Sequence, residues 1–398
     1  MRPPHPTLRL LTLLLVSMMT IMASAAISPS LPRLRMAFEW VPGIDLWVRL
    51  VVSLPALFTA MGAPLVGVLI DRFGRKRLLV AAVVLYGVAG SLPGVLTSLP
   101  LILVCRALLG LAVGGLMTTA AALIADYYAG PERGVVLGRQ AAFMGVGGFV
   151  FMLGGGLLAD IHWRAPFAVY LYAFLLLPLI LFFLPEPEVK RGAGAGGAGR
   201  MALPWNTLWQ VYGLAMLGMM IFYLIPVQLP FLLRRLGVQS SALAGLAVGV
   251  STVVGSAVSL RYARVRQLLG YRSIMAVLFA CMALGYVLVG LSQSYAAVVG
   301  GLAVSGLGQG LLTPNMANWA GEVAPEAARG RVMGLLTTSL FLGQFVSPLL
   351  AQPLIGAVGL GGAFLAAGGL LSALAGTFGA LAWHARPRER SPGDQTAQ

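Results

Sequence analysis

The sequence predicts an all-α membrane protein of twelve transmembrane helices, arranged as two parallel six-helix repeats. Its 398 residues are 59% hydrophobic and only 10% charged, with a mean hydropathy of +0.89, whereas soluble domains carry about 25% charged residues. Twelve apolar runs are long enough to cross a bilayer, which takes roughly 20 helical residues. The third observation is an internal repeat at an offset of 196 residues. A chain of this length has no room for a large soluble domain as well.

The twelve apolar runs follow one another with short connections. Because an unpaired backbone amide is costly in lipid, each run is expected to form a helix. The runs lie at 8–28, 46–68, 78–97, 99–124, 135–158, 166–184, 206–232, 241–260, 273–292, 295–318, 332–354 and 358–383. The first run has features of a secretory signal, since Arg2 and Arg9 precede it and small residues occupy 23–25. Its apolar stretch is longer than the roughly 7–15 residues of a signal core, so we expect it to be retained as a span.

The repeat divides the chain into two halves. At the 196-residue offset the matching residues include Gly110 with Gly306, Asp126 with Glu322, and Arg133-Gly134 with Arg329-Gly330. Six spans return the chain to its starting side, so the two halves are parallel. We assign 1–184 to the first half, 185–204 to a Gly/Ala-rich linker typical of a flexible chain, and 205–398 to the second half with a short tail.

The positive charges predict the orientation. With an even number of spans both termini share a side, and that side carries 20 of the 27 Lys and Arg residues, against 6 on the opposite side. Lys and Arg accumulate in cytoplasmic loops, so we expect both termini and the linker in the cytoplasm and the chain in an inner membrane. The net charge of +15 is then chiefly an orientation signal. It is spread over short loops, unlike the single basic face of a nucleic-acid-binding protein.

The loop after the second apolar run carries the most specific motif, Gly67-Val68-Leu69-Ile70-Asp71-Arg72-Phe73-Gly74-Arg75-Lys76-Arg77. An acid followed by cations between two helices resembles the signature loop of the major facilitator superfamily. The matching residues are Gly67, Asp71, Arg72, Gly74, Arg75 and Lys76, while Ile70 replaces the usual small residue. With twelve spans and a central linker, the resemblance covers essentially the whole chain. The alternative is that these cations only mark topology, which would require neither the acid nor the glycines.

Sterics assign a role to each glycine of this loop. Gly67 is expected to allow close helix packing, and Gly74 to permit a tight turn. The resemblance makes Asp71, with Arg72 beside it, part of a conformational latch. When the cytoplasmic face is shut, Asp71 would contact the start of a helix in the opposite half, near Gly330, where the helix dipole is positive.

The resemblance also pairs Arg75 with Asp126, at the cytoplasmic end of the fourth span. The repeat predicts a weaker copy of this pair in the second half, made by Arg272 and Glu322. Breaking these contacts would open the inward-facing state.

Arg106 is the only charged residue well inside an apolar run. A central arginine costs roughly 2.5–3.5 kcal/mol on insertion scales, so it should face a wet cavity or a polar partner. The resemblance implicates this arginine, in a pattern that continues to Gly110, in coupling or substrate contact. A structural arginine bonded to backbone carbonyls is the alternative.

Polar residues within the apolar runs are candidates for the substrate cavity. The resemblance implies a cavity lined by spans one, four, seven and ten, and the candidates are Ser24, Tyr223, Gln228, Gln309 and Asn315. Methionines of spans one and seven would add an adaptable wall. Small polar residues also serve as packing contacts between membrane helices, which is the alternative for each candidate.

Two features bear on direction and coupling. Antiporters of the superfamily usually carry Gly-Pro followed two residues later by Gly-Gly in span five. Here Gly155-Gly156 is present but Phe151-Met152 replaces Gly-Pro, which weakens the prediction of export. Proton coupling normally needs an ionisable group within the membrane. The nearest acids, Asp45 and Asp160, stand at the outer ends of spans two and five, where interfacial anchoring is the alternative, Asp45 pairing with Arg49 one helical turn away.

These observations predict a secondary active transporter and not an enzyme. The sequence has no Gly-x-x-x-x-Gly-Lys-Ser/Thr loop for ATP, and its histidines lie outside the apolar runs, so we expect no cofactor and no metal. The expected activity is proton-coupled efflux of a small neutral or anionic amphipathic drug or metabolite by alternating access. The expected partners are the substrate, a coupling proton and the lipid bilayer, with the chain a monomer. An uptake symporter for a small metabolite, or more remotely a non-transporting membrane enzyme or receptor, is the alternative.

Overall fold

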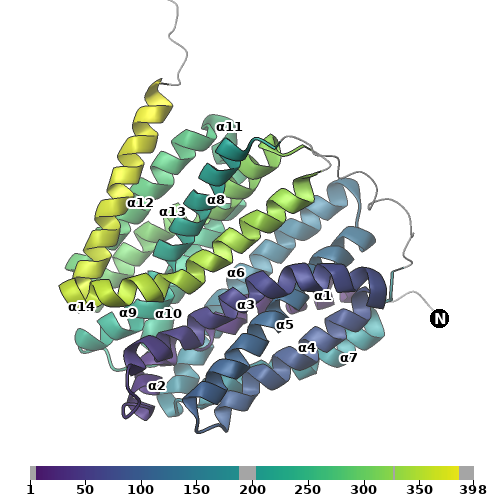
Figure 1. The fold of residues 1–398 in the computed structure, drawn as a ribbon, viewed down its shortest axis with the longest axis horizontal. Helices are drawn as coiled ribbons and strands as arrows, with labels where there is room; N and C mark the ends of the chain where they lie inside the picture. Colours follow the sequence, from purple (N-terminus) through teal and green to yellow (C-terminus); the bar gives the residue numbers. More distant parts are fainter. Residues whose placement is uncertain (1–5, 188–202, 326–327, 385–398) are drawn as a thin grey trace, which may run out of the picture.

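The computed structural model describes residues 6–187, 203–325 and 328–384, except for the side chains of Asp71 and Pro131. Within these ranges the chain is helical and has no strand. Eleven helical segments are long and apolar enough to cross a membrane. The last of them, α14 (Arg329–His384), is divided at Gly359, whose φ of +76° lies outside the helical region. Its two arms, green and yellow in Figure 1, make separate crossings, so the twelve predicted spans of a multi-pass membrane protein are confirmed.

The first half contains six spans. They are α1 (Pro6–Ala25), continued by η1 (Ser28–Ser30) and α2 (Leu31–Ala37); α3 (Ile44–Phe73); α4 (Arg75–Ser91), continued by η2 (Leu92–Gly94); α5 (Leu99–Tyr127); α6 (Gly130–Ile161); and η3 (Ala165–Leu171) with α7 (Tyr172–Phe183). We call the end of the bundle at which α7 ends the linker face, and the opposite end, with α2, the far face. Most of the predicted linker lies outside the described residues.

The second half contains the other six spans. They are α8 (Trp205–Phe222) with α9 (Leu224–Arg235); α10 (Ser241–Leu260); α12 (Tyr271–Leu291); α13 (Tyr295–Val323); and the two arms of α14. The short helix α11 (Tyr262–Leu268) joins α10 to α12 at the linker face.

The two halves share their internal packing at the predicted offset. α3 packs against α5 in the first half, and α10 packs against α13 in the second. A Cβ on Gly110 would overlap the carbonyl oxygen of Pro55, and a Cβ on Gly306 would lie 2.8 Å from the carbonyl oxygen of Ser251. Both residues of the second contact follow those of the first by 196 positions. Glycine therefore permits the same close helix crossing in each half, and the repeat is confirmed.

The halves meet where α6 packs on α10 and where α3 packs on α14. At the α6–α10 crossing a Cβ on Gly156 would overlap the carbonyl oxygen of Ser241, and a Cβ on Gly245 would overlap that of Met152. Glycines of span five therefore form a close-packing face. Gly154 is its exception, because a Cβ there would meet nothing within 4 Å. The two halves touch through their backbones, so an added methyl group would push them apart.

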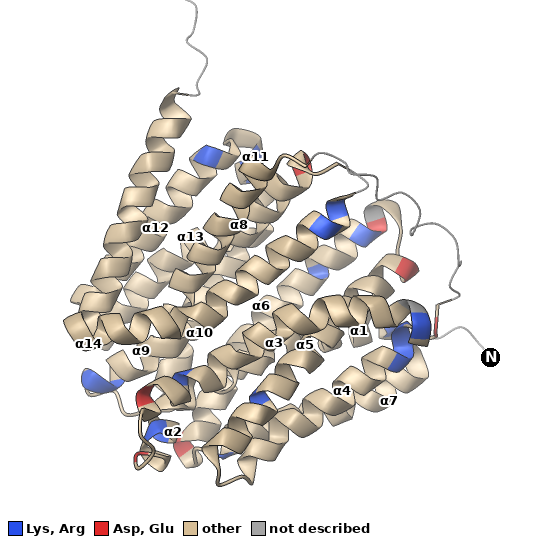
Figure 2. Cartoon of the chain, viewed as in Figure 1, with Lys and Arg blue, Asp and Glu red and all other residues tan. Residues whose placement is uncertain are grey.

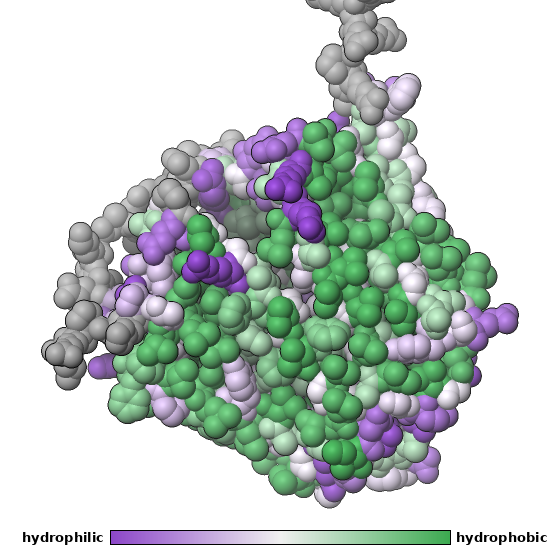
Figure 3. Space-filling model, turned by 180° about the vertical axis from the view of Figure 1, so that it is seen from behind, coloured by the Kyte–Doolittle hydropathy of each residue, from purple (hydrophilic) through white to green (hydrophobic). Residues whose placement is uncertain are grey.

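The surface is that of a protein in lipid. Figure 3 shows apolar side chains across the broad middle of one face of the molecule, with hydrophilic residues gathered at its two opposite ends. Large apolar side chains exposed on the spans include Leu157, Leu175, Val253 and Leu284. The charged residues drawn in Figure 2 also lie mostly toward the linker face and the far face.

Candidate functional site

A cavity of about 340 Å³ lies between the two halves. α1 and α6 line it from the first half, and α8, α10 and α13 line it from the second. Its lining residues are Ile21, Ala141, Met144, Gly145, Met219, Phe222, Ser251, Thr252, Gly255, Ser256, Ser259, Gln309, Gly310, Leu312, Thr313 and Pro314. These residues carry hydroxyl, amide and apolar groups but neither acid nor base. Such a wall suits a small molecule with a large apolar part and a few hydrogen-bonding groups.

Gln309 is the predicted cavity residue that lines this cavity. Its Oε1 accepts a hydrogen bond from the hydroxyl of Ser251 (3.2 Å), and its Nε2 donates to the hydroxyl of Ser305 (2.7 Å). The expected set of lining spans is partly wrong, because span four contributes no lining residue whereas spans five and eight do. The reason is the close glycine crossing of α6 and α10, which brings their facing surfaces to the border of the cavity.

Three predicted cavity residues lie instead at the contact between the halves toward the far face. The Tyr223 hydroxyl donates to the Val52 carbonyl oxygen (3.2 Å) and lies within hydrogen-bonding reach of the Ser24 hydroxyl. The Oε1 of Gln228 accepts from Nε of Arg49 (2.8 Å), and both side chains are buried. These residues hold the halves together in this conformation and do not line the central cavity.

Asn315, the fifth predicted cavity residue, is buried within the second half. Its Oδ1 accepts from the Tyr262 hydroxyl (3.1 Å), and its Nδ2 donates to the Tyr271 carbonyl oxygen (3.3 Å). Burial raises the pKa of Tyr262 to about 12, so the hydroxyl stays protonated and remains a donor. Asn315 therefore joins α13 to α11 and α12.

Arg106 lies in the interior of the first half and does not line the central cavity, so the expected substrate contact is not found there and its coupling role stays a prediction. It is fully buried, and its guanidinium donates to the Tyr170 hydroxyl (2.9 Å) and to the Gly90 carbonyl oxygen (3.0 Å). The rings of Phe167 and Tyr170 lie 5.1 and 4.9 Å from its Cζ. The Tyr170 hydroxyl in turn donates to the Ala23 carbonyl oxygen (2.8 Å). Polar and aromatic partners thus accommodate the charge while tying α5 to α4, η3 and α1.

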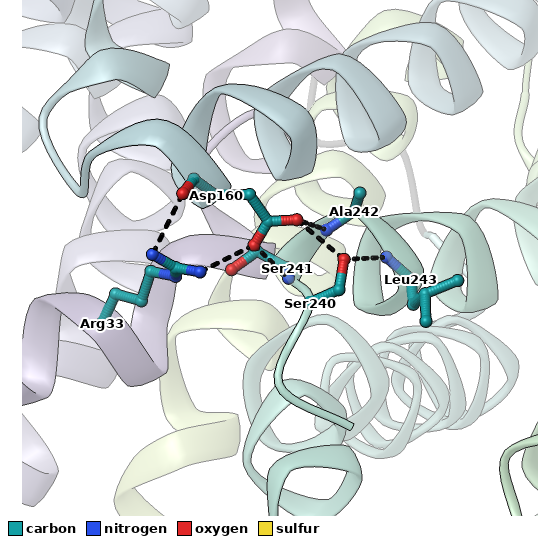
Figure 4. Close-up of polar contacts among 6 residues, drawn as sticks. All are labelled: Arg33, Asp160, Ser240, Ser241, Ala242 and Leu243. Carbon is teal, nitrogen blue, oxygen red and sulfur yellow. Dashed lines mark hydrogen bonds and ion pairs between the residues drawn. The ribbon is translucent and has the colours of Figure 1, made fainter. Parts of the chain in front are cut away.

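Asp160, at the far end of α6, joins the two halves (Figure 4). Its carboxylate accepts hydrogen bonds from the Ser240 hydroxyl (2.7 Å) and from the backbone amides of Ser241 (2.7 Å) and Ala242 (3.1 Å). Arg33 of the first half pairs with the same carboxylate at 2.9 Å. A carboxylate of one half therefore caps the first turn of α10 in the other, where unpaired amides and the helix dipole favour negative charge.

The contacts between the halves are unequal at the two faces. Ser28 also donates across the halves, to the Pro226 carbonyl oxygen. The other described hydrogen bonds between the halves are those of Asp160, Tyr223 and Arg49. All of them lie toward the far face. No hydrogen bond or ion pair between the halves is found at the linker face within the described ranges. This conformation is closed at the far face.

The linker-face loop contains part of the predicted latch. Gly74, with φ of +86°, makes the tight turn between α3 and α4 as predicted. The expected ion pair between Nε of Arg75 and Oδ2 of Asp126 is present at 3.0 Å. Glu186, for which the sequence predicts only a place in the linker, accepts hydrogen bonds from the backbone amides of residues 75 and 76 and so caps α4. The predicted close packing at Gly67 is wrong, because a Cβ there would meet nothing within 4 Å.

The first two charged residues of the motif stand in the last turn of α3. Arg72 is exposed, with its Cζ 5.5 Å from the centre of the Phe73 ring. The side chain of Asp71 lies outside the described part of the chain, so its predicted contact near Gly330 stays a prediction.

The second half has a different version of the Arg75 ion pair. Glu322 accepts from Arg266 (3.4 Å) and from the Tyr271 hydroxyl, and Cζ of Arg266 lies 4.0 Å from the centre of the Tyr271 ring. The predicted partner of Glu322, Arg272, is wrong. The residue that stands 196 positions after Arg75 is Tyr271, one position before Arg272. Tyrosine supplies the hydrogen bond at the equivalent place, and an arginine from α11 supplies the charge.

Two six-helix halves around a central cavity, closed at the far face, define a transporter of the two-repeat class. The family model of the Major Facilitator Superfamily matches residues 13–269 and 211–398, which together cover almost the whole chain. The chain belongs to this superfamily, whose members are transporters and not enzymes.

Similar proteins agree with this assignment. Proteins named multidrug resistance protein MdtG are 36% identical over 141 residues in Klebsiella pneumoniae and 33% identical over 155 residues in Proteus mirabilis. These matches cover 35% and 38% of this chain, and only 34% and 38% of those relatives. The chain therefore matches little more than a third of their length.

Solved structures share the fold at low sequence identity. A bacterial homologue of the human lysosomal transporter Spinster, in an inward-facing and occupied conformation, has a TM-score of 0.78 at 17% identity, covering 94% of this chain and 96% of that one. The D-xylose-proton symporter has a TM-score of 0.76 at 17% identity, covering 94% and 97%.

Proposed function

We propose that this chain exports a small amphipathic drug or metabolite from the cytoplasm by alternating access, with a proton gradient as the energy source. The linker face is the cytoplasmic face of an inner membrane, with both termini and the linker on that side. Residues 1–184 and 205–398 are the two moving halves. The chain acts as a monomer in the bilayer, without a cofactor and without catalytic activity.

The observation that carries the proposal is the unequal contact between the halves. Hydrogen bonds between them lie toward the far face, and the linker face has none within the described ranges. This arrangement is expected of an inward-facing state, which a substrate enters from the cytoplasm. The relatives named multidrug resistance proteins favour a drug as substrate and export as direction.

The central cavity suggests the chemistry of the substrate. Its wall has amide and hydroxyl groups of Gln309, Thr313 and Ser256 and apolar groups of Met144 and Met219, without a carboxylate to attract a cation. Neutral or anionic amphipathic molecules fit this wall better than cationic dyes. The flexible methionine side chains would adapt to ligands of several shapes.

The linker-face loop would form the gate that alternates with the far-face contacts. In the proposal, Asp71 and Arg72 engage the second half only when the linker face shuts. The pair of Arg75 with Asp126 is intact although the far face is closed, contrary to the expectation that it breaks in the inward-facing state. Both residues belong to the first half, so in the proposal the pair holds α4 to α5 in each state. Glu322 acts in the same way in the second half, through Arg266.

Uptake by a symporter is the second candidate. It is favoured by Phe151-Met152, which stands where antiporters of the superfamily usually have Gly-Pro. The structural likeness to a proton symporter is compatible with it but shows only the fold.

Transport in everted membrane vesicles with an acidic interior separates the two directions. An exporter exchanges interior protons for substrate and accumulates it inside, whereas a symporter releases protons and substrate together. We expect accumulation of a neutral or anionic amphiphile, lost when nigericin in potassium buffer collapses the pH gradient. Loss with valinomycin alone would instead assign the drive to the membrane potential, which supplies about 2.3 kcal/mol per charge per 100 mV.

Two amide-to-leucine variants, one in the cavity and one outside it as a matched control, test the site of binding in this assay. Gln309→Leu alters the cavity wall and should raise KM for the transported molecule at least fivefold. Gln140→Leu removes an amide that bonds Ser17 within the first half and should leave KM within twofold of the parent. Accumulation of cationic dyes alone, with equal KM values in the two variants, would refute the proposed substrate class and cavity.

A further inference from the structure

A second cavity, of about 570 Å³, lies at the far face. α2 and α3 line it from the first half, and α9 and α14 line it from the second. It is separate from the central cavity, since the two have no lining residue in common. Its volume is in the range of sites that hold drug-sized ligands.

The far-face cavity has an excess of positive charge. Its lining includes four guanidinium groups, those of Arg35, Arg49, Arg234 and Arg235, and one carboxylate, that of Asp45. The carboxylate is already shared, because Arg35 binds it at 2.7 Å and Arg49 at 3.4 Å, as the sequence predicted for Arg49. No ion pair is found for Arg234 or Arg235 within the described ranges. The lining therefore carries a formal excess of three positive charges, and Glu39, a carboxylate that also acts on Arg35, does not line the cavity.

Arg49 provides a buried, desolvated charge at the border of this cavity. The residue is 3% exposed, and its Cζ lies 4.3 Å from the centre of the Phe231 ring. Arg35 and Arg235 both lie close enough to repel its charge. Beside it the Nε2 of Gln228, a residue that is 1% exposed, has no hydrogen-bond partner. Gln228 contacts Arg49 but is not among the residues that line the cavity. A buried donor without an acceptor costs about 1–3 kcal/mol, so an acceptor group that reached it past Arg49 would be stabilising.

The rest of the wall is largely apolar, with one further polar side chain, Gln352, whose buried Oε1 has no hydrogen-bond partner among the described residues. Pro32 and Met36 line the cavity from the first half, and Phe231, Ile355 and Leu360 line it from the second. An occupant that satisfies both parts of the wall has an anionic head and a compact apolar body. Arginine is well suited to the head group, because its planar donors match carboxylate and phosphate oxygens.

We propose that the far-face cavity is a second ligand site that binds an amphipathic anion with a phosphate or carboxylate head, and that its occupant holds the far face closed. The site exists only while α2 and α3 lie against α9 and α14, so a bound anion favours this state over the far-open one. The consequence for transport rests on the proposed function, whereas binding does not. An anion on the outer side would slow export by delaying the opening of the far face.

Binding of phenyl phosphate to the purified full-length protein, in nanodiscs of phosphatidylcholine, tests the site by calorimetry. We expect saturable binding, at least tenfold weaker for neutral benzyl alcohol. Arg234→Gln with Arg235→Gln should weaken phenyl phosphate binding at least tenfold, while Arg234→Lys with Arg235→Lys stays within threefold. The matched control, Arg261→Gln with Arg264→Gln at the linker face, removes the same charge and should change binding less than twofold.

A second experiment, with lipid, distinguishes the two sources of the anionic head group, a soluble anion and a membrane lipid. If phosphatidylglycerol is the occupant, increasing its fraction in the nanodisc weakens phenyl phosphate binding, and native mass spectrometry finds a retained lipid that the double glutamine variant loses. Either source supports the site. Equal phenyl phosphate binding by the variant and the parent, or no bound anion of either source, overturns it. Because these readouts need no transport, failure of the export proposal would leave them unchanged.

Discussion

The hydroxyl of Ser240 in the second half donates a hydrogen bond to Oδ2 of Asp160 in the first half, over 2.7 Å. The same carboxylate accepts from two backbone amides at the start of α10. The contact that closes the far face is therefore a helix cap supplied by the other half of the molecule. Opening that face must break three hydrogen bonds to one carboxylate.

Asp160→Asn should shift the protein toward a state open at the far face. The amide keeps one oxygen acceptor but loses the charge, and hydrogen bonds to charged groups contribute about 1.5–3 kcal/mol. Partial exposure of the Asp160 carboxylate reduces this contribution. We therefore expect roughly a tenfold shift in the ratio of the far-open state to the far-closed state. The measurement is the labelling rate of Val52→Cys, a buried position between the halves, by an impermeant maleimide added outside cells.

The control for this variant is Glu132→Gln, the same change at the exposed opposite end of α6. It should leave the labelling rate within twofold. Equal rates for Asp160→Asn and Glu132→Gln would show that the cap does not hold the far face.

Gly245→Ala should also open the far face. A Cβ at this position would overlap the Met152 carbonyl oxygen, and overpacking costs about 1–3 kcal/mol. Backbone cannot move aside as a side chain can, so α10 must separate from α6. Gly154→Ala is the matched control, because its Cβ would meet nothing within 4 Å. We expect faster labelling of Val52→Cys and a lower Tm for Gly245→Ala only, and an unchanged rate would mean that the crossing tolerates the methyl group.

The spans and the repeat could be predicted because they depend on local composition and on constant spacing. Twelve apolar runs, Gly110 with Gly306, and the turn at Gly74 each follow from what a membrane helix or a tight turn requires of the chain. The pair of Arg75 with Asp126 was predicted in another way, from the resemblance of the loop to the signature of the superfamily. Ser240 also carried a usable signal, since a serine just before an apolar run is typical of a helix N-cap.

The contacts of the other candidate residues could not be predicted from the sequence. They depend on which surface of each helix faces which neighbour, and residue spacing does not contain that information. Arg106 has the same sequence signal whether it faces a cavity or the interior of one half. The aromatic residues that accommodate it lie about 60 positions away, on η3. The partner of Glu322 was predicted wrongly for a different reason, because the repeat keeps a place in space and not a residue type. At that place Tyr271 replaces an arginine.

Arg106→Ala should lower stability more than it alters substrate recognition. The change leaves a cavity and removes the donors to the Tyr170 hydroxyl and the Gly90 carbonyl oxygen, at a cost of roughly 2–4 kcal/mol. We expect a Tm lower by several degrees in detergent and an unchanged KM in the folded fraction. Arg106→Lys, which keeps the charge, should have a Tm between those of the parent and of Arg106→Ala. A normal Tm with a changed KM or a changed pH profile of transport would support a coupling role.

Arg266→Gln and Arg272→Gln form a direct test of the second-half ion pair. Arg266 contacts Glu322 at 3.4 Å and stacks on Tyr271, whereas no contact of Arg272 with Glu322 is found within the described ranges. Exposed ion pairs contribute about 0–1 kcal/mol, so we expect a fall in Tm of one or two degrees for the first variant and none for the second. The opposite order would show that Arg272 is the partner after all.

Ser256→Cys and Val52→Cys, in a background with Cys105→Ala and Cys281→Ala, should report opposite faces of the resting protein. Ser256 lines the central cavity, which we propose opens to the cytoplasm, whereas Val52 is buried where the far-face contacts meet. An impermeant maleimide should label Ser256→Cys in everted vesicles at least tenfold faster than in intact cells. Val52→Cys should react slowly in both, and a saturating transported substrate should protect Ser256→Cys. Fast labelling of Ser256→Cys from outside intact cells would reverse the orientation, and with it the direction of transport.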